Sequence, residues 1–348
     1  MATIVAAGAI PPLVKLLSPG TKADLQCYAA GILASLAQDA EYAVTIAAAG
    51  AVPRLVHLIK PGTASDVANN AAVAMLDLSK NDVNKVTIAA AGAIPLLVKL
   101  LRPGSPAHLV GPRSRADVQE YAAGALMNLA CTPEFQATIA AAGAVPHLVL
   151  LLGPGSPAEV RKYASGALCA LSRNEGNAAT IAAAGAIPPL VKLMGATGDT
   201  QEHAVGALGE LAFVAEYAVT VAAAGAIPPL VRLLGPSAAP GLRRVLAKAL
   251  GALSRNADNA VTLVTAGAIP ALGRLLVPAN PYNTRVVAAH VITQIAAADD
   301  PSKHPSIIRE LLPQELLLDA LRIVSDVGKA HGFTAPKVHG RSFAEWGF

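Results

Sequence analysis

The residue types that could carry out chemistry are scattered in this sequence instead of being grouped in motifs. The eight histidines and three cysteines show no metal-ligand spacing, and no G-x-x-x-x-G-K-[ST], G-x-S-x-G or H-E-x-x-H motif occurs. Enzymes need such arrangements to activate water, a nucleophile or a phosphate. We therefore expect no catalytic residue, no metal site and no cofactor.

Aromatic and polar side chains do recur at fixed places in a ten-residue signature. It reads YAAGILASLA from Tyr28, YAAGALMNLA from Tyr121 and YASGALCALS from Tyr163, with weaker copies elsewhere. Three of the six tyrosines thus share its first position, where a ring can pack on a ligand and a hydroxyl can bond to it. The alternative is that these rings pack between neighbouring helices.

The candidate binding residues are polar side chains at the first, fourth and eighth positions of the signature, with one neighbouring arginine. Glycine fills the fourth position in four of the seven copies. Because glycine inside a helix costs up to about 1 kcal/mol relative to alanine, its presence indicates the close approach of a neighbouring helix or of a ligand backbone. The candidates are Tyr28, Asn70, Asp77, Tyr121, Asn128, Tyr163, His203, Glu210, Arg244, Lys248, His290 and Gln294.

One expected helix, GLRRVLAKALGALSRN, is basic. Arg244 and Lys248 are four residues apart and therefore share a helix face near the signature positions. An acidic peptide or a phosphate could bind there, and a solvated helix face is the alternative. The basic residues of this segment are Arg243, Arg244, Lys248 and Arg255.

These residues belong to an internal repeat. The tetrapeptide Gly-Ala-Ile/Val-Pro begins seven times, with spacings of 42, 42, 51, 42, 40 and 42 residues. The distance from the first residue of each signature to the next tetrapeptide is always 22 residues, so all length changes fall in one other segment. That segment must be a surface loop, since loops tolerate insertions better than packed helices do. The tetrapeptides begin at Gly8, Gly50, Gly92, Gly143, Gly185, Gly225 and Gly267.

Each repeat has the pattern of three helices. In residues 174–215, a short first helix should end at Gly185, and a second should begin at Pro188 or Pro189, where the missing N–H costs nothing. The signature should form a third, longer helix, because its apolar residues recur at helical spacing. The longer third repeat carries a loop insertion near 105–116, which serves either as a partner contact or as a tolerated insertion.

Composition excludes several classes of protein. With 53% hydrophobic and 14% charged residues the chain is not disordered, and glycines and prolines interrupt its longest uncharged stretch, so we expect no transmembrane segment. A net charge of +4 without a basic run does not indicate nucleic-acid binding. The first residues resemble no targeting signal, and three scattered cysteines suit a reducing compartment. We expect a cytoplasmic location, with the nucleus as the alternative.

Seven in-register copies of a three-helix unit of about 42 residues, with a Gly-Ala-Ile-Pro corner and an Ala-Leu-x-x-Leu third helix, resemble the armadillo repeat. The array is most similar to plant and algal members, vacuolar protein 8, relatives of β-catenin and the armadillo part of U-box proteins. The resemblance implies an all-α, right-handed α-solenoid (superhelix) of about seven three-helix repeats, whose third helices line a concave groove.

Both ends of the sequence depart from the repeat. We expect an armadillo array over 1–298, a degenerate capping repeat over 299–330 that keeps only Pro313 of the corner, and an aromatic C-terminal tail over 331–348. The first repeat lacks most of its first helix, which leaves an apolar face uncovered. The chain therefore either continues a longer protein or self-associates, through this end or through the tail. Four of the 12 aromatic rings lie in the tail, so we expect it to dock on a protein surface.

The expected function is non-catalytic protein recognition, in which the third-helix groove binds a segment of a protein or peptide partner. One alternative is the substrate-recognition part of a larger ubiquitin ligase, although no U-box is visible. Another is a nuclear-transport-type receptor similar to importin α, a family that places Trp and Asn at the fourth and eighth signature positions. This sequence has no Trp at the fourth position, and Asn128 is its only Asn at the eighth.

Overall fold

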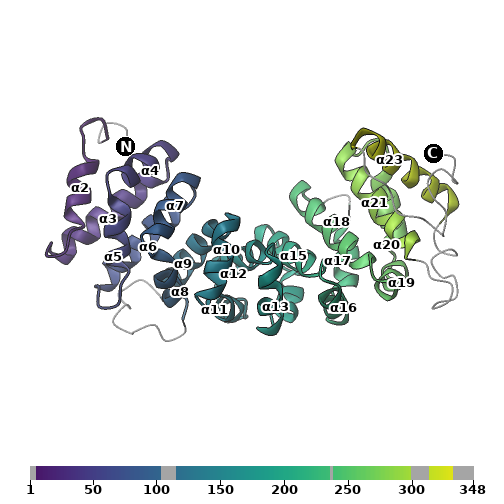
Figure 1. The fold of residues 1–348 in the computed structure, drawn as a ribbon, viewed down its shortest axis with the longest axis horizontal. Helices are drawn as coiled ribbons and strands as arrows, with labels where there is room; N and C mark the ends of the chain where they lie inside the picture. Colours follow the sequence, from purple (N-terminus) through teal and green to yellow (C-terminus); the bar gives the residue numbers. More distant parts are fainter. Residues whose placement is uncertain (1–4, 103–114, 236–237, 299–312, 332–348) are drawn as a thin grey trace. The chain divides into compact units, whose positions relative to one another are not determined.

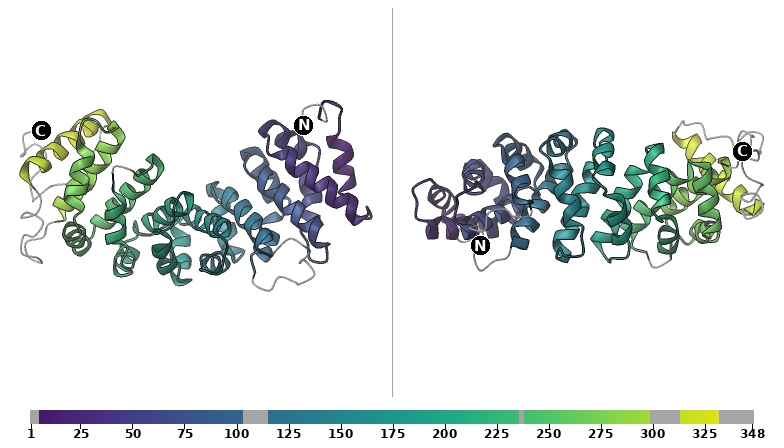
Figure 2. Two further views of the ribbon diagram at one scale, coloured as in Figure 1. Left: turned by 180° about the vertical axis from the view of Figure 1, so that it is seen from behind. Right: turned by 90° about the horizontal axis from the view of Figure 1, so that it is seen from below.

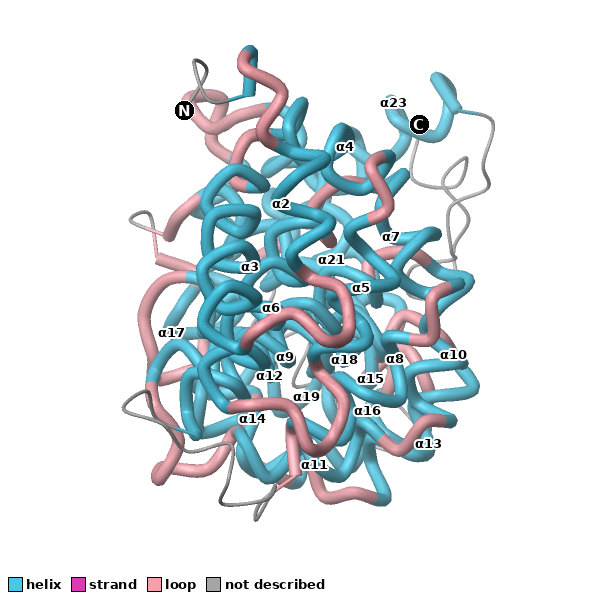
Figure 3. Tube along the Cα trace, turned by 90° about the vertical axis from the view of Figure 1, so that its left-hand side faces the viewer, coloured by secondary structure: helices cyan, strands magenta, loops and turns pink. Residues whose placement is uncertain are grey.

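The computed structural model describes residues 5–102, 115–235, 238–298 and 313–331. These residues form helices and no strand, which confirms the all-α prediction (Figures 1 and 3). The chain divides into two compact parts, residues 1–185 and 186–348. They are called the N-terminal part and the C-terminal part below.

The N-terminal part follows the predicted order of first, second and third helices. Its third helices are α3, α6, α9 and α12, and in the part of the sequence described they pack against one another in chain order (Figure 2). The helices are α2 (Ile10–Leu16), α3 (Ala23–Ala37), α4 (Ala40–Ala48), α5 (Ala51–Leu58), α6 (Ser65–Leu78), α7 (Asp82–Ala90), α8 (Ala93–Leu100), α9 (Arg115–Ala130), α10 (Pro133–Ala141), α11 (Ala144–Leu151), α12 (Ala158–Leu171) and α13 (Glu175–Ala183).

The C-terminal part repeats this order. Its third helices α15, α18 and α21 pack in sequence, and α23 packs along α21. The helices are α14 (Ile187–Leu193), α15 (Asp199–Leu211), α16 (Ala215–Ala223), α17 (Ile227–Leu233), α18 (Pro240–Ser254), α19 (Ala257–Thr265), α20 (Ala268–Leu276), α21 (Tyr282–Ala297) and α23 (Gln314–His331).

The glycine of the repeated tetrapeptide forms the corner between the first and second helices. Gly143 has φ of 82°, a left-handed conformation that side chains disfavour, and α10 and α11 meet there at 88°. The proline that follows is accommodated within the first turn of the second helix, as in α14. The corner sets the second helix nearly perpendicular to the first, and the second helix packs on the third helix of the same repeat.

The core consists of aliphatic side chains and alanines between the helices. Leu33 on α3 and Leu126 on α9 are fully buried, as are many alanines of the third helices, including Ala72 and Ala123. Small alanine side chains let neighbouring helices approach closely, so a core with few aromatic rings is well filled.

The last described helix, α23, follows directly after Pro313 and packs mainly against α21 and also against α20. Leu317, Leu321 and Val324 are buried in this contact region. The loop insertion near 105–116 lies mostly, and the tail over 332–348 entirely, outside the described residues, and the boundaries at 298 and 330 remain predictions.

No single helix in the described ranges is both long and apolar enough to cross a membrane. Three helix pairs reach the length and apolar composition of a membrane span only when their two helices are counted together, and each pair is bent by more than 80°.

Candidate functional site

The first third helix, α3, exposes an apolar stripe. Tyr28 is 69% exposed, and Leu25 and Ile32 on the same helix face are 44% and 42% exposed. The equivalent residues of α6, Val67 and Ala74, are 1% and 0% exposed, because α3 packs over that side of α6. In α3 no described helix takes this role, so Tyr28 lies on an open surface.

Tyr163 packs on the neighbouring third helix. A methyl group placed on Gly124 of α9 would lie 3.2 Å from Cδ1 of Tyr163 on α12. Gly31 of α3 stands in the same relation to Asn70 of α6, whose Nδ2 would lie 3.1 Å from such a methyl group. Gly31 and Gly124 therefore leave room for the first-position side chain of the next third helix, and this contact holds the Tyr163 ring in place.

The candidate amides connect neighbouring third helices. Asn70 Nδ2 donates to the carbonyl oxygen of Cys27 at 2.9 Å, and Asn128 Nδ2 donates to Oγ of Ser79 at 3.0 Å. Asn128 Nδ2 also lies 3.3 Å from the carbonyl oxygen of Leu76. These bonds hold the side chains in fixed positions. The sequence pattern did not indicate them, because the partners are 43 to 52 residues away.

Carboxylates gather on the third helices of the N-terminal part. Burial, and then the nearby charges of Glu159 and Asp117, raise the pKa of Glu120 above its ordinary value. Asp77 is 5% exposed and accepts a bond of 2.6 Å from Nζ of Lys80 on the same helix. Tyr121 and Asn128 of α9 are half-buried.

The C-terminal part brings cations and an aromatic ring together. Lys248 Nζ lies 2.7 Å from Oε1 of Glu210 and 5.1 Å from the ring centre of Phe213. Arg244, 77% exposed, lies 3.9 Å from Oε1 of Glu202. His203, another candidate, is half-buried on α15. The structure thus places Glu210 beside Lys248, and Arg244 lies one turn before Lys248 on the same helix.

A second polar contact lies on α21. His290 Nε2 and Gln294 Nε2 are 2.9 Å apart, and Oγ of Ser254 on α18 donates to Oε1 of Gln294 at 3.1 Å. Burial lowers the pKa of His290 below its ordinary value. At neutral pH the ring is therefore uncharged, and its Nε2 can accept from the Gln294 amide.

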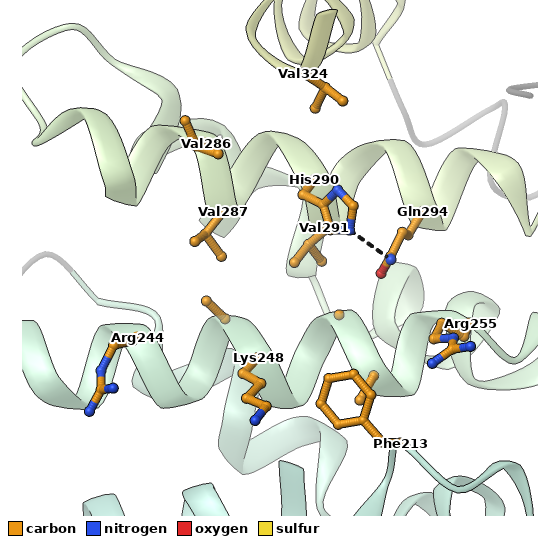
Figure 4. A pocket seen from close by; sticks show the side chains of 13 residues that line it. Phe213, Arg244, Lys248, Arg255, Val286, Val287, His290, Val291, Gln294 and Val324 are labelled. Carbon is orange, nitrogen blue, oxygen red and sulfur yellow. Dashed lines mark hydrogen bonds between the residues drawn. The ribbon is translucent and has the colours of Figure 1, made fainter. Parts of the chain in front are cut away.

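A pocket of about 480 Å³ lies between α18, α21 and α23 (Figure 4). Its lining includes the candidates Arg244, Lys248, His290 and Gln294. Its walls include Ala247, Val287 and Val324, which the sequence analysis did not select. Phe213, 45% exposed, closes one side. The position directly after the signature holds a polar residue in most other copies. The aromatic residue at this position was therefore the one sequence feature that could have pointed to the pocket.

A family model described as the armadillo/beta-catenin-like repeat matches residues 2–38 and 174–213. Solved structures extend the likeness. A designed armadillo repeat protein, 29% identical, has a TM-score of 0.61 over 70% of this chain and 99% of its own. The chain belongs to the armadillo-repeat family.

Other solved armadillo-like structures agree. An engineered protein, 28% identical, has a TM-score of 0.76 and covers 92% of this chain and 78% of its own. A designed armadillo repeat protein in complex with the peptide (KR)4, also 28% identical, has a TM-score of 0.59 over 70% of this chain and 99% of its own. No curated protein matches the sequence.

The described portion of this armadillo chain holds no group of three or more His, Cys, Asp or Glu side chains able to bind a metal ion. Its side-chain clusters are pairs and small groups on the third helices. Ordered polar and aromatic side chains of this kind can bind a ligand through hydrogen bonds and packing.

Proposed function

We propose that this armadillo protein is a non-catalytic scaffold that binds a peptide segment of a protein partner on its third helices. The supporting observation is that a designed armadillo protein of the same fold is solved in complex with a peptide. The third helices of each part lie next to one another and carry the polar candidates, so a peptide crossing several helices meets one such side chain from each repeat.

Preorganisation of the surface supports this proposal. Asn128 is fixed by Ser79, and Tyr163 lies over Gly124, so neither side chain loses much conformational freedom when a ligand binds. Tyr121, on the same helix as Asn128, is half-buried and presents a ring and a hydroxyl. We propose Tyr121, Asn128 and Tyr163 as the centre of the binding surface of the N-terminal part.

The test is selection of peptides from an unbiased display library on the full chain, followed by calorimetry. For a peptide bound to the N-terminal part, Tyr121→Ala should weaken binding by more than about 1 kcal/mol. The matched control is Tyr42→Ala, because Tyr42 is a half-buried tyrosine on the first helix α4 of the same part. Affinity unchanged in Tyr121→Ala, together with a lower melting temperature, would identify Tyr121 as a packing residue.

We also propose that the apolar stripe of α3 pairs with a second copy of this chain. In α6 the same face is covered by a third helix of this chain, so a third helix is the complement that it fits. Sedimentation velocity should show a concentration-dependent dimer, which Ile32→Glu abolishes. Val86→Glu, at a valine of α7 that is 60% exposed, should leave the dimer intact. A wild-type protein that stays monomeric at all concentrations contradicts this proposal.

A further inference from the structure

The pocket between α18, α21 and α23 has an apolar floor. Ala247, Gly251 and Ala252 of α18 line it together with Val287 and Val291 of α21, and Figure 4 shows the two valines. A volume of about 480 Å³ is enough for a large side chain. An apolar floor favours an apolar side chain and gives a free inorganic anion few partners.

The rim of this pocket is cationic. Arg244 and Lys248 lie on one face of α18, because they are four residues apart, and Arg255, the residue directly after this helix, also lines the pocket. Among the described lining residues none is Asp or Glu. The carboxylates of Glu202 and Glu210 on α15 approach Arg244 and Lys248, whereas the exposed Arg255 forms no ion pair with any described residue.

The charge is a property of the whole segment and not of one helix. Residues 217–298 contain seven Lys or Arg and a single acidic residue, Asp258, whereas the full chain has a net charge of only +4. Asp258 lies on the first helix α19, away from the pocket lining. The third helices of the N-terminal part instead carry Asp66, Asp77 and Glu120. The segment 217–298 is thus much more basic than the chain as a whole.

We propose that this pocket binds an acidic peptide segment of a partner, in which one large apolar side chain is flanked by Asp or Glu. The apolar side chain fills the space between α18 and α21, and the flanking carboxylates pair with Arg244, Lys248 and Arg255. This inference rests on the proposed peptide-binding function and gives the partner's chemistry. A basic peptide is repelled at this site, because it would add positive charge to a cationic rim.

The experiment is fluorescence polarisation with three labelled heptapeptides and the full chain. The first has a central tryptophan between two runs of three glutamates, the second has lysines in place of the glutamates, and the third has alanine in place of the tryptophan. The first should bind at least about tenfold more tightly than either of the others, and its affinity should fall as salt is added. Equal or tighter binding of the lysine peptide overturns the proposal.

Variants then locate the site. Arg255→Glu and Ala247→Trp, which reverse one rim charge and fill the pocket, should each weaken the acidic peptide at least about fivefold. The matched control Arg232→Glu changes an exposed arginine of the second helix α17 in the same segment. The affinity of this variant for the acidic peptide should stay within about twofold of the wild-type value. Unchanged affinity in both pocket variants, or competition by inorganic phosphate as strong as that by the peptide, overturns the proposal.

The library selection distinguishes a failure of the acidic specificity from a failure of the peptide-binding function. If the library yields peptides that bind but lack acidic residues, and the glutamate peptide does not bind, the acidic specificity is wrong and the scaffold function stands. If neither the library nor the three heptapeptides give a ligand, both proposals fail.

Discussion

Replacing Leu126 with alanine will lower the free energy of unfolding by about 2 to 5 kcal/mol. Leu126 is fully buried on α9, which packs against α6, α8 and α12. The substitution removes apolar contacts and leaves a cavity that rigid neighbouring helices close only in part. Since whole domains are stable by about 5 to 15 kcal/mol, the loss should be visible as a clear shift of the denaturation midpoint.

Chemical denaturation followed by circular dichroism measures this loss, and Leu150→Ala is its control. Leu150 is the same residue type on α11 of the same part, but it is 61% exposed, so its removal should cost less than about 0.5 kcal/mol. Equal losses in the two variants would mean that Leu126 is not in a packed core, which contradicts the repeat packing described here.

Replacing Gly209 with valine will destabilise the C-terminal part by about 1 to 3 kcal/mol. A Cβ on Gly209 of α15 would lie 3.1 Å from Cα and 3.2 Å from N of Ala249 on α18. Those are backbone atoms and cannot rotate away, so the two helices must move apart. The displacement should also disturb Lys248, the residue before Ala249, and thereby weaken ligand binding at the adjacent pocket.

The control is a second helical glycine whose neighbours leave room for a methyl group. A Cβ on Gly251 of α18 would lie 3.4 Å from Oε1 of Gln294 and 3.8 Å from Cγ2 of Val291, which are ordinary contacts. Gly251→Ala should therefore be neutral or should gain up to about 1 kcal/mol from helix propensity. Thermal denaturation compares the melting temperatures of the two variants with that of the wild type. A Gly209→Val protein as stable as the wild type would show that α15 and α18 are not in close contact.

The fold could be predicted largely from the sequence because its signals are local. The glycine that begins each tetrapeptide needs the left-handed conformation seen at Gly143, and the proline that follows fits only the first turn of a helix. Repetition of this corner at nearly constant spacing indicated three helices per repeat. The helix against which α23 packs could not be predicted, because α23 lacks the glycine corner and is held by its buried leucines.

The candidate site was predicted only as a set of positions. The sequence by itself determined which side chains recur on the third helices, that three tyrosines share one position, and that α18 is basic. Only the tertiary structure decided which of them act together, because the contacts join residues 38 to 49 positions apart: Asn128 with Ser79, Lys248 with Glu210, Gln294 with Ser254. Helical periodicity fixes the face on which a residue lies, whereas the packing of neighbouring helices fixes its partners, and those partners leave the space between α18 and α21 open as a pocket.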